Sequence, residues 1–162
     1  MRGPLPSHAV IWVASLTFLV PSPPTSFREA GAVSGRVSIA ERGNKSGTDV
    51  GQAVVWLEAP GSRPAAGKAV SIITEGKEFR PRVTVVPVGS TITFPNNDPF
   101  NHNVFSLSEE GAFDLGLYGR GQSKSTRFNR PGVIRVYCNV HATMATFILV
   151  RDNSWFAQPS LS

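Results

Sequence analysis

The chain has 162 residues, enough to bury a hydrophobic core as one domain, or as one domain with a small extension. Its 15 Gly and 13 Pro residues, with only 17% charged residues, favour short strands joined by tight turns and argue against a helical bundle. The net charge of +5 indicates a mildly basic surface, and because no recognised nucleic-acid-binding motif accompanies it, nucleic acid is not expected as a partner. Five basic residues form either a solvated face or a docking patch for an acidic partner: Arg120, Lys124, Arg127, Arg130 and Arg135.

Residues 1–32 have the pattern of a signal peptide. Arg2 supplies a positive start, and residues 9–20 form an uncharged apolar run that is too short to cross a bilayer comfortably. Residues 30–32 (Ala-Gly-Ala) offer a cleavage site, and Ser26 offers a second one. We therefore expect export to the periplasm or another extracytoplasmic space, with no stable membrane insertion after cleavage. An uncleaved membrane anchor is the alternative.

Residues 33–75 are predicted to form an N-terminal β extension. Strand-like runs cover residues 35–39, 53–58 and 69–74, and polar turns that contain Gly separate them. The segment contains neither His nor Cys, so we expect no chemistry there. Either its strands pack on the main sandwich or it is a separate small binding module.

Residues 76–152 are predicted to form the functional domain, and residues 153–162 a C-terminal tail. Residues 116–125 are rich in Gly and are expected to be irregular. Because no window shows a helical period, we predict an all-β fold, an antiparallel Greek-key β-sandwich to which the extra N-terminal strands are added. The strands expected in this domain cover residues 82–86, 91–94, 101–105, 133–138 and 144–150.

Four potential metal ligands remain once the predicted signal peptide is set aside. The chain has one Cys, three His and two Met, of which Met1 and His8 fall in the signal. The four that remain are His102, Cys138, His141 and Met144. Two imidazoles and a thiolate in a plane, with a weakly bound axial thioether, are the ligands of a blue-copper site. We therefore predict a site for one copper, with one distant ligand and three from a single loop.

Cys138 supports this interpretation. Cysteines of exported proteins are normally paired in disulfides, and this one has no partner in the chain. An intermolecular bridge and an inert buried thiol are the other possibilities, but the spacing to His141 and Met144 favours a ligand. Considered singly, Met144 is typical of core packing and His102 of a loop histidine. Zinc is less suitable than copper, because structural zinc sites are rich in thiolates and a thioether binds zinc poorly.

Each ligand has an expected role. Cys138 would bind as the thiolate, and His102 and His141 would complete the plane as neutral imidazoles. Met144 would be the weak axial sulfur that tunes the reduction potential. From the order of the ligands in the chain, we expect His141 to be the imidazole nearer the surface. Its expected apolar rim consists of Pro99, Phe100, Val140 and Ala142.

These residues resemble a known family. Residues 101–104 (Asn-His-Asn-Val), followed by residues 138–144 (Cys-x-x-His-x-x-Met), resemble the plastocyanin- and amicyanin-like cupredoxins. Residues 94–98 (Phe-Pro-Asn-Asn-Asp) before the first His are similar to those of bacterial plastocyanin-like proteins labelled as methylamine-utilisation proteins. The resemblance covers roughly residues 78–150.

The resemblance implies a cupredoxin fold and one type 1 copper. It also implies that Asn103, next to the first His ligand, ties the two ligand loops together by hydrogen bonding. The loop departs from the family at two positions. Related loops often carry Pro between Cys and His or just after His, where this chain has Val140 and Ala142.

From these observations we expect an exported blue copper protein that carries single electrons between redox proteins such as cytochromes or dehydrogenases, and that works as a monomer. We expect no enzymatic activity, because multicopper oxidase or nitrite-reductase chemistry needs further coppers bound by additional histidines. Two alternatives are a periplasmic copper carrier or buffer, although the chain has no Met- or His-rich tract, and a metal-free β-sandwich interaction module.

Overall fold

The computed structural model describes residues 32–38, 48–58 and 65–160. Apart from Ala32, the predicted signal peptide lies outside these residues. Two units are distinguished, Met1–Ser34 and Gly35–Ser162, and every described strand belongs to the second. None of the described segments forms a helix with the length and hydropathy that a bilayer crossing requires.

The larger sheet has five strands in the order β5-β11-β10-β7-β8. Most of these strands are rich in β-branched and aromatic residues, which suit a pleated, half-buried surface. β10 and β11 pair antiparallel from Gly132↔Val150 to Tyr137↔Ala145, so the loop of residues 138–144 connects the end of β10 to the start of β11. The strands are β5 (Val83–Pro87), β7 (His102–Ser106), β8 (Phe113–Tyr118), β10 (Gly132–Tyr137) and β11 (Ala145–Arg151).

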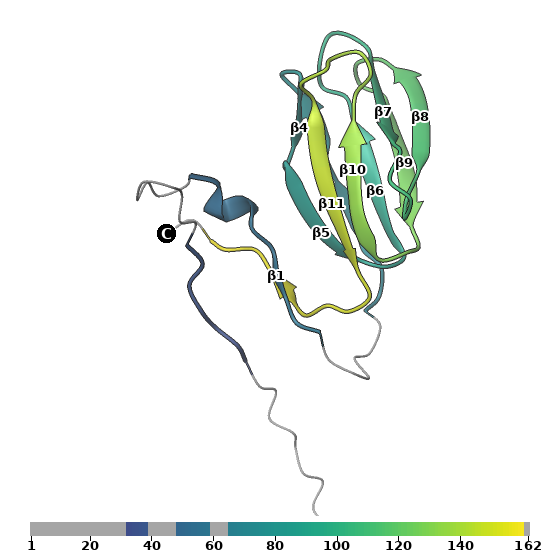
Figure 1. The fold of residues 1–162 in the computed structure, drawn as a ribbon. Helices are drawn as coiled ribbons and strands as arrows, with labels where there is room; N and C mark the ends of the chain where they lie inside the picture. Colours follow the sequence, from purple (N-terminus) through teal and green to yellow (C-terminus); the bar gives the residue numbers. More distant parts are fainter. Residues whose placement is uncertain (1–31, 39–47, 59–64, 161–162) are drawn as a thin grey trace, which may run out of the picture. The chain divides into compact units, whose positions relative to one another are not determined.

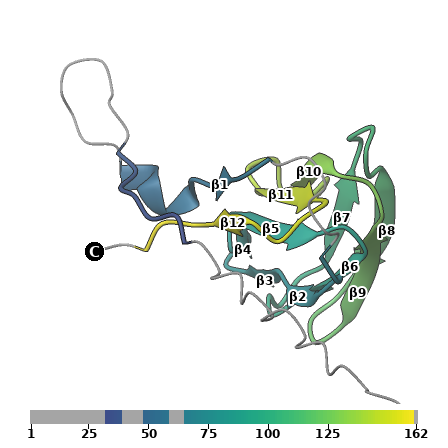
Figure 2. The same ribbon diagram turned by 90° about the horizontal axis from the view of Figure 1, so that it is seen from below.

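The smaller sheet has three strands in the order β2-β6-β9: β2 (Ala69–Ser71), β6 (Ser90–Pro95) and β9 (Ser123–Phe128). Two further strand pairs lie outside these sheets. β3 (Ile73–Glu75) and β4 (Glu78–Arg80) form a hairpin, and β1 (Val55–Trp56) pairs with β12 (Phe156–Ala157). The two views show the sheets as stacked layers (Figures 1 and 2).

The core lies between the two sheets. Buried residues alternate with more exposed ones along β6 and β11, as expected when one face of a strand packs inward. Phe94 on β6 is fully buried, and its ring contacts those of Phe79 and Phe113 at centroid distances of 6.4 and 6.2 Å. These aromatic contacts join the hairpin and both sheets.

The all-β sandwich predicted from sequence is confirmed, but three details of the prediction were wrong. The sheets are mixed rather than antiparallel, because β5 pairs parallel with β11 and β2 pairs parallel with β6. Much of the segment at 116–125 that was expected to be irregular lies in β8 and β9. Residues 35–38 form no strand, and Ile39 lies outside the described residues.

The predicted N-terminal extension contains a short 3₁₀ helix, η1 (Thr48–Gln52), besides β1, β2 and β3. Two of its strands are hydrogen-bonded to the main fold. β2 forms the edge of the smaller sheet, and Thr74 on β3 makes an isolated bridge with Asn96. The end of this segment therefore reaches the loop that precedes His102.

Candidate metal centre

His102 is the first residue of β7 and is fully buried. Within its own sheet, His102 pairs with Tyr118 on the neighbouring strand β8. The loop before it is organised by Asn96, whose Nδ2 donates to the carbonyl oxygens of Phe100 and Tyr118 at 2.9 and 3.2 Å. The Oδ1 of Asn96 accepts the N–H of Asp98 at 2.9 Å. His102 is therefore placed by the sheet and by a buried amide.

The other predicted ligands lie on the loop between β10 and β11. Cys138 follows β10 directly and is buried, with 3% of its surface exposed. Its N–H donates to the carbonyl oxygen of Met144 at 3.3 Å, and the N–H of Met144 donates to that of His141 at 3.1 Å. Because the strand pairing continues to Tyr137↔Ala145, both ends of this short loop are fixed.

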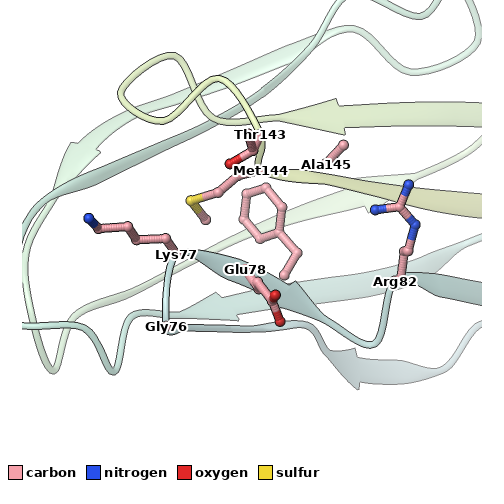
Figure 3. Close-up of a pocket in the computed structure, with 8 residues that line it drawn as sticks. Gly76, Lys77, Glu78, Arg82, Thr143, Met144 and Ala145 are labelled. Carbon is pink, nitrogen blue, oxygen red and sulfur yellow. The ribbon is translucent and has the colours of Figure 1, made fainter.

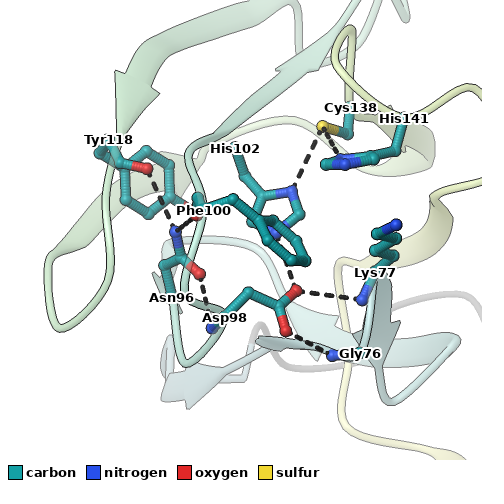
Figure 4. A network of polar contacts seen from close by, with 9 residues as sticks. All are labelled: Gly76, Lys77, Asn96, Asp98, Phe100, His102, Tyr118, Cys138 and His141. Carbon is teal, nitrogen blue, oxygen red and sulfur yellow. Dashed lines mark hydrogen bonds and ion pairs between the residues drawn. The ribbon is translucent and has the colours of Figure 1, made fainter.

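The fold brings His102, Cys138 and His141 together. The Sγ of Cys138 lies 3.6 Å from the Nδ1 of His102 and 4.0 Å from the Nδ1 of His141. The three ligand atoms all lie within 4.8 Å of one another, and His141 is the half-buried member of the group (Figure 4). Both imidazoles thus present the same nitrogen to the sulfur.

These distances fit a shared metal ion. Bonds of about 2.0 Å to nitrogen and about 2.3 Å to sulfur, set roughly 120° apart, separate two donor atoms by roughly 3.7 Å. The observed 3.6 and 4.0 Å bracket this value. One thiolate and two imidazoles suit copper, whose blue sites use this trigonal set.

Met144 is the fourth predicted ligand and is also buried, with 1% of its surface exposed. Its backbone is bonded to Cys138, and its side chain lines a groove of about 340 Å³ between the ligand loop and the β3–β4 hairpin. Lys77, Glu78 and Arg82 line the same groove (Figure 3). The thioether is therefore on the loop and inside the protein, and its role as axial ligand stays a prediction.

Asp98 is a residue of the site that the sequence analysis did not identify. Its Oδ2 lies 2.8 Å from the Nε2 of His102, the ring nitrogen opposite the one that faces Cys138. Its two oxygens also accept the N–H groups of Gly76 and Lys77 (Figure 4). The only sequence feature that could have indicated it is a carboxylate four residues before a predicted His ligand, in a loop whose composition is typical of a simple turn.

Asn103 was predicted to tie the two ligand loops together. In the structure its Nδ2 donates to the Oδ1 of Asp114 on β8 at 2.6 Å. Its Oδ1 is buried without a hydrogen-bond partner in the described part of the chain. Asn103 therefore fixes β7 to β8 beside His102, and the predicted link to the second loop stays a prediction.

Several ionisable groups around the site have shifted pKa values. Burial lowers the pKa of His141, and electrostatic interactions with His102 and Lys77 lower it further, against the opposing effect of Asp98. Burial alone would raise the pKa of Asp98, but hydrogen bonds from Lys77, Gly76 and His102 outweigh it, so that the pKa is lowered. Burial also raises the pKa of Tyr118 to about 12. These shifts favour a neutral His141 and an ionised Asp98.

An apolar surface adjoins His141. The ring of Phe100 lies 5.3 Å from the rings of both His102 and His141, measured between centroids. Val140 and Ala142, on either side of His141 in the chain, are exposed. His141 is therefore the member of the group nearest solvent, next to apolar side chains.

Three solved structures are among those similar to this chain. A copper-containing nitrite reductase (NirK) from Thermus scotoductus is 26% identical over 60% of this chain, with a TM-score of 0.50, and this chain spans 25% of it. The purple cupredoxin from Nitrosopumilus maritimus is 26% identical over 51% of this chain and 99% of its own, with a TM-score of 0.45. A variant of amicyanin in the Cu(I) state is 20% identical over 60% of this chain and 98% of its own, with a TM-score of 0.47. A search of curated proteins finds no match.

A β-sandwich that carries a Cys, two His and a Met in this arrangement belongs to the class of cupredoxin-like blue copper proteins. The family model described as "Copper binding proteins, plastocyanin/azurin family" matches residues 69–151, slightly more than half of the chain. The chain therefore belongs to the plastocyanin/azurin family of copper-binding proteins, and its cofactor is one type 1 copper.

Proposed function

We propose that this protein is an exported carrier of single electrons, in which His102, Cys138, His141 and Met144 would hold one copper ion. The observation that supports this most directly is the grouping of three ligand atoms within 4.8 Å of one another, two of them on buried residues. Copper in such a site alternates between Cu(II) and Cu(I), and so carries one electron.

The residues of the chain have separate roles in this function. Cys138 binds as the thiolate, and both His residues keep Nδ1 free of a proton in order to bind. The sheet pairings and the backbone hydrogen bonds of the loop hold these atoms close together. A scaffold that enforces one compromise geometry reduces the rearrangement that accompanies electron transfer, whether or not that geometry is strained.

His141 is the proposed route for electrons, since it is half-buried beside Phe100 and two exposed apolar residues. A flat apolar surface suits brief contact with redox partners, for which cytochromes or dehydrogenases are candidates. The proposed working form is a monomer. This arrangement separates the buried thiolate from solvent and leaves one imidazole edge close to a partner.

We do not propose an enzymatic activity. The described residues contain two His, and both belong to the group around Cys138. Reduction of nitrite is the activity named for the Thermus scotoductus protein, of which this chain spans only a quarter. A further catalytic copper would need additional imidazoles.

Export and domain boundaries also belong to the proposal. Residues 1–32 are proposed to be a cleaved signal peptide, because a positive start, a short apolar run and a small-residue cleavage pattern occur in that order. Residues 33–75 are the N-terminal extension, residues 76–152 the copper-binding domain and residues 153–162 the tail. The mature protein is then periplasmic or otherwise extracytoplasmic.

The test is to add Cu(II) to the purified protein and to record its visible spectrum. We expect an intense thiolate-to-copper band that disappears completely in Cys138→Ser, with Leu107→Ser, at an exposed position outside the site, as the control. A colourless wild-type protein would contradict the proposal. Slow exchange of copper with fast self-exchange of electrons would support a carrier of electrons, whereas ready transfer of copper to an acceptor would indicate a carrier of the metal.

A further inference from the structure

Asp98 is a nearly buried residue with four polar contacts, three of them made by its carboxylate. Its side chain is 7% exposed, and its Oδ2 lies 2.8 Å from the Nε2 of His102. Its Oδ1 accepts the N–H of Gly76 at 2.7 Å, and its Oδ2 accepts the N–H of Lys77 at 3.0 Å. Its own N–H is bonded to Asn96. Both carboxylate oxygens are therefore fixed in position.

The two N–H donors come from a two-residue hairpin turn in which both residues have positive φ angles. Gly76 and Lys77 connect β3 to β4, and their φ angles are +65° and +59°. A positive φ is uncommon for a residue with a Cβ such as Lys77. Consecutive N–H groups in a turn can form a concave site for an anion. Here the anion is the Asp98 carboxylate, so the hairpin holds this side chain against His102.

This geometry determines which nitrogen of His102 is available to a metal. An ionised carboxylate only accepts hydrogen bonds, so Nε2 must carry the proton in a contact of 2.8 Å. In the neutral ring, Nδ1 then has the free lone pair, and Nδ1 is the atom that lies 3.6 Å from the sulfur of Cys138. A hydrogen bond from a metal-binding His to a carboxylate fixes its tautomer and makes it a stronger donor.

We propose that Asp98 is a positioning residue of the copper site, which fixes the tautomer of His102, strengthens its binding to Cu(II) and thereby lowers the reduction potential. This inference rests on the proposed role of His102 as a ligand. The β3–β4 turn then helps to position His102 through Asp98, although the turn precedes every proposed ligand in the chain.

The first experiment needs no copper. In the metal-free protein, at an alkaline pH where the imidazole is neutral, ¹⁵N NMR of His102 is expected to show the Nε2–H tautomer. Its Nε2 proton should exchange slowly with water, because the ring and the carboxylate are buried. The Nδ1–H tautomer in the wild-type protein would overturn the proposal, and this result does not depend on folding of a variant.

The second experiment compares Asp98→Asn with Glu75→Gln. Both variants replace a carboxylate by an amide, but Glu75 is an exposed residue at the end of β3, beside the same turn. Asp98→Asn is expected to weaken Cu(II) binding about 10- to 100-fold. If Cu(I) binding is unchanged, each tenfold loss corresponds to a rise of about 59 mV in potential. Glu75→Gln is expected to leave both quantities near their wild-type values.

The outcomes separate this inference from the proposed function. A blue wild-type protein whose potential rises equally in Asp98→Asn and Glu75→Gln would overturn the role of Asp98 and leave the electron carrier intact. A wild-type protein without the blue band would overturn the electron carrier, while the Nε2–H tautomer would still show that Asp98 orients His102. A specific rise in Asp98→Asn together with the Nε2–H tautomer supports both.

Discussion

The two halves of the metal centre are built in different ways. His102 is fully buried, begins a strand inside the five-stranded sheet and is bonded through Nε2 to a carboxylate. Cys138, His141 and Met144 belong to a short loop that is held by two backbone hydrogen bonds, and His141 is half-buried. The buried half fixes geometry through tertiary contacts, whereas the loop places three proposed ligands by local contacts and gives access to solvent.

The largest effect is expected in the aromatic core that joins the two sheets, away from the ligand loop. Phe94→Ala deletes a fully buried ring that contacts Phe79 and Phe113, and it should lower the free energy of unfolding by about 3–5 kcal/mol. Chemical denaturation of the metal-free protein measures this change. Val140→Ala, on the exposed side of the ligand loop, is the matched control and should stay within about 0.5 kcal/mol of wild type. Equal losses would contradict the contrast.

A smaller effect is expected from the loop that leads to His102. Asn96→Ala removes three hydrogen bonds of a fully buried amide, to Phe100, Tyr118 and Asp98, and leaves their partners unsatisfied. The expected loss of unfolding free energy is about 1–3 kcal/mol. Asn97→Ala is the control, because Asn97 is exposed and its backbone bond to Thr74 is retained. If the two variants were equally stable, the buried amide would not be what organises this loop.

The smallest effect on stability should come from the loop half itself. Met144→Leu nearly conserves volume at a buried position and should cost less than about 1.5 kcal/mol. The copper protein should keep its colour, but its reduction potential should rise, because a weak axial sulfur stabilises Cu(II) more than Cu(I). Voltammetry measures this change, and an unchanged potential would show that Met144 does not bind the metal.

The sequence predicted the central grouping because it offers few alternatives. With one Cys in the chain and two His beyond the predicted signal, a site built from a thiolate and imidazoles could only use His102, Cys138 and His141, and the fold brings these three together. The sandwich followed from the absence of helical periods and the abundance of turn residues. Composition and spacing were sufficient for both.

Other features depend on contacts between distant segments, which a local pattern does not contain. Gly116 adopts a positive φ within β8, and its presence there made a real strand resemble a loop. Asp98 looked like an ordinary turn residue, because the N–H groups that hold it come from residues 76 and 77. The parallel pairing of β5 with β11 likewise joins segments that lie far apart in the chain.

That parallel pairing has a consequence for the order of assembly. In the sheet, β5 has β11 as its neighbour, and β11 is the last strand of the sandwich to be synthesised. The edge of the larger sheet therefore stays incomplete until nearly the whole chain is available, which is typical of folds dominated by long-range pairing. The ligand loop ends where β11 begins, so the sheet holds both ends of this loop only after β11 has paired.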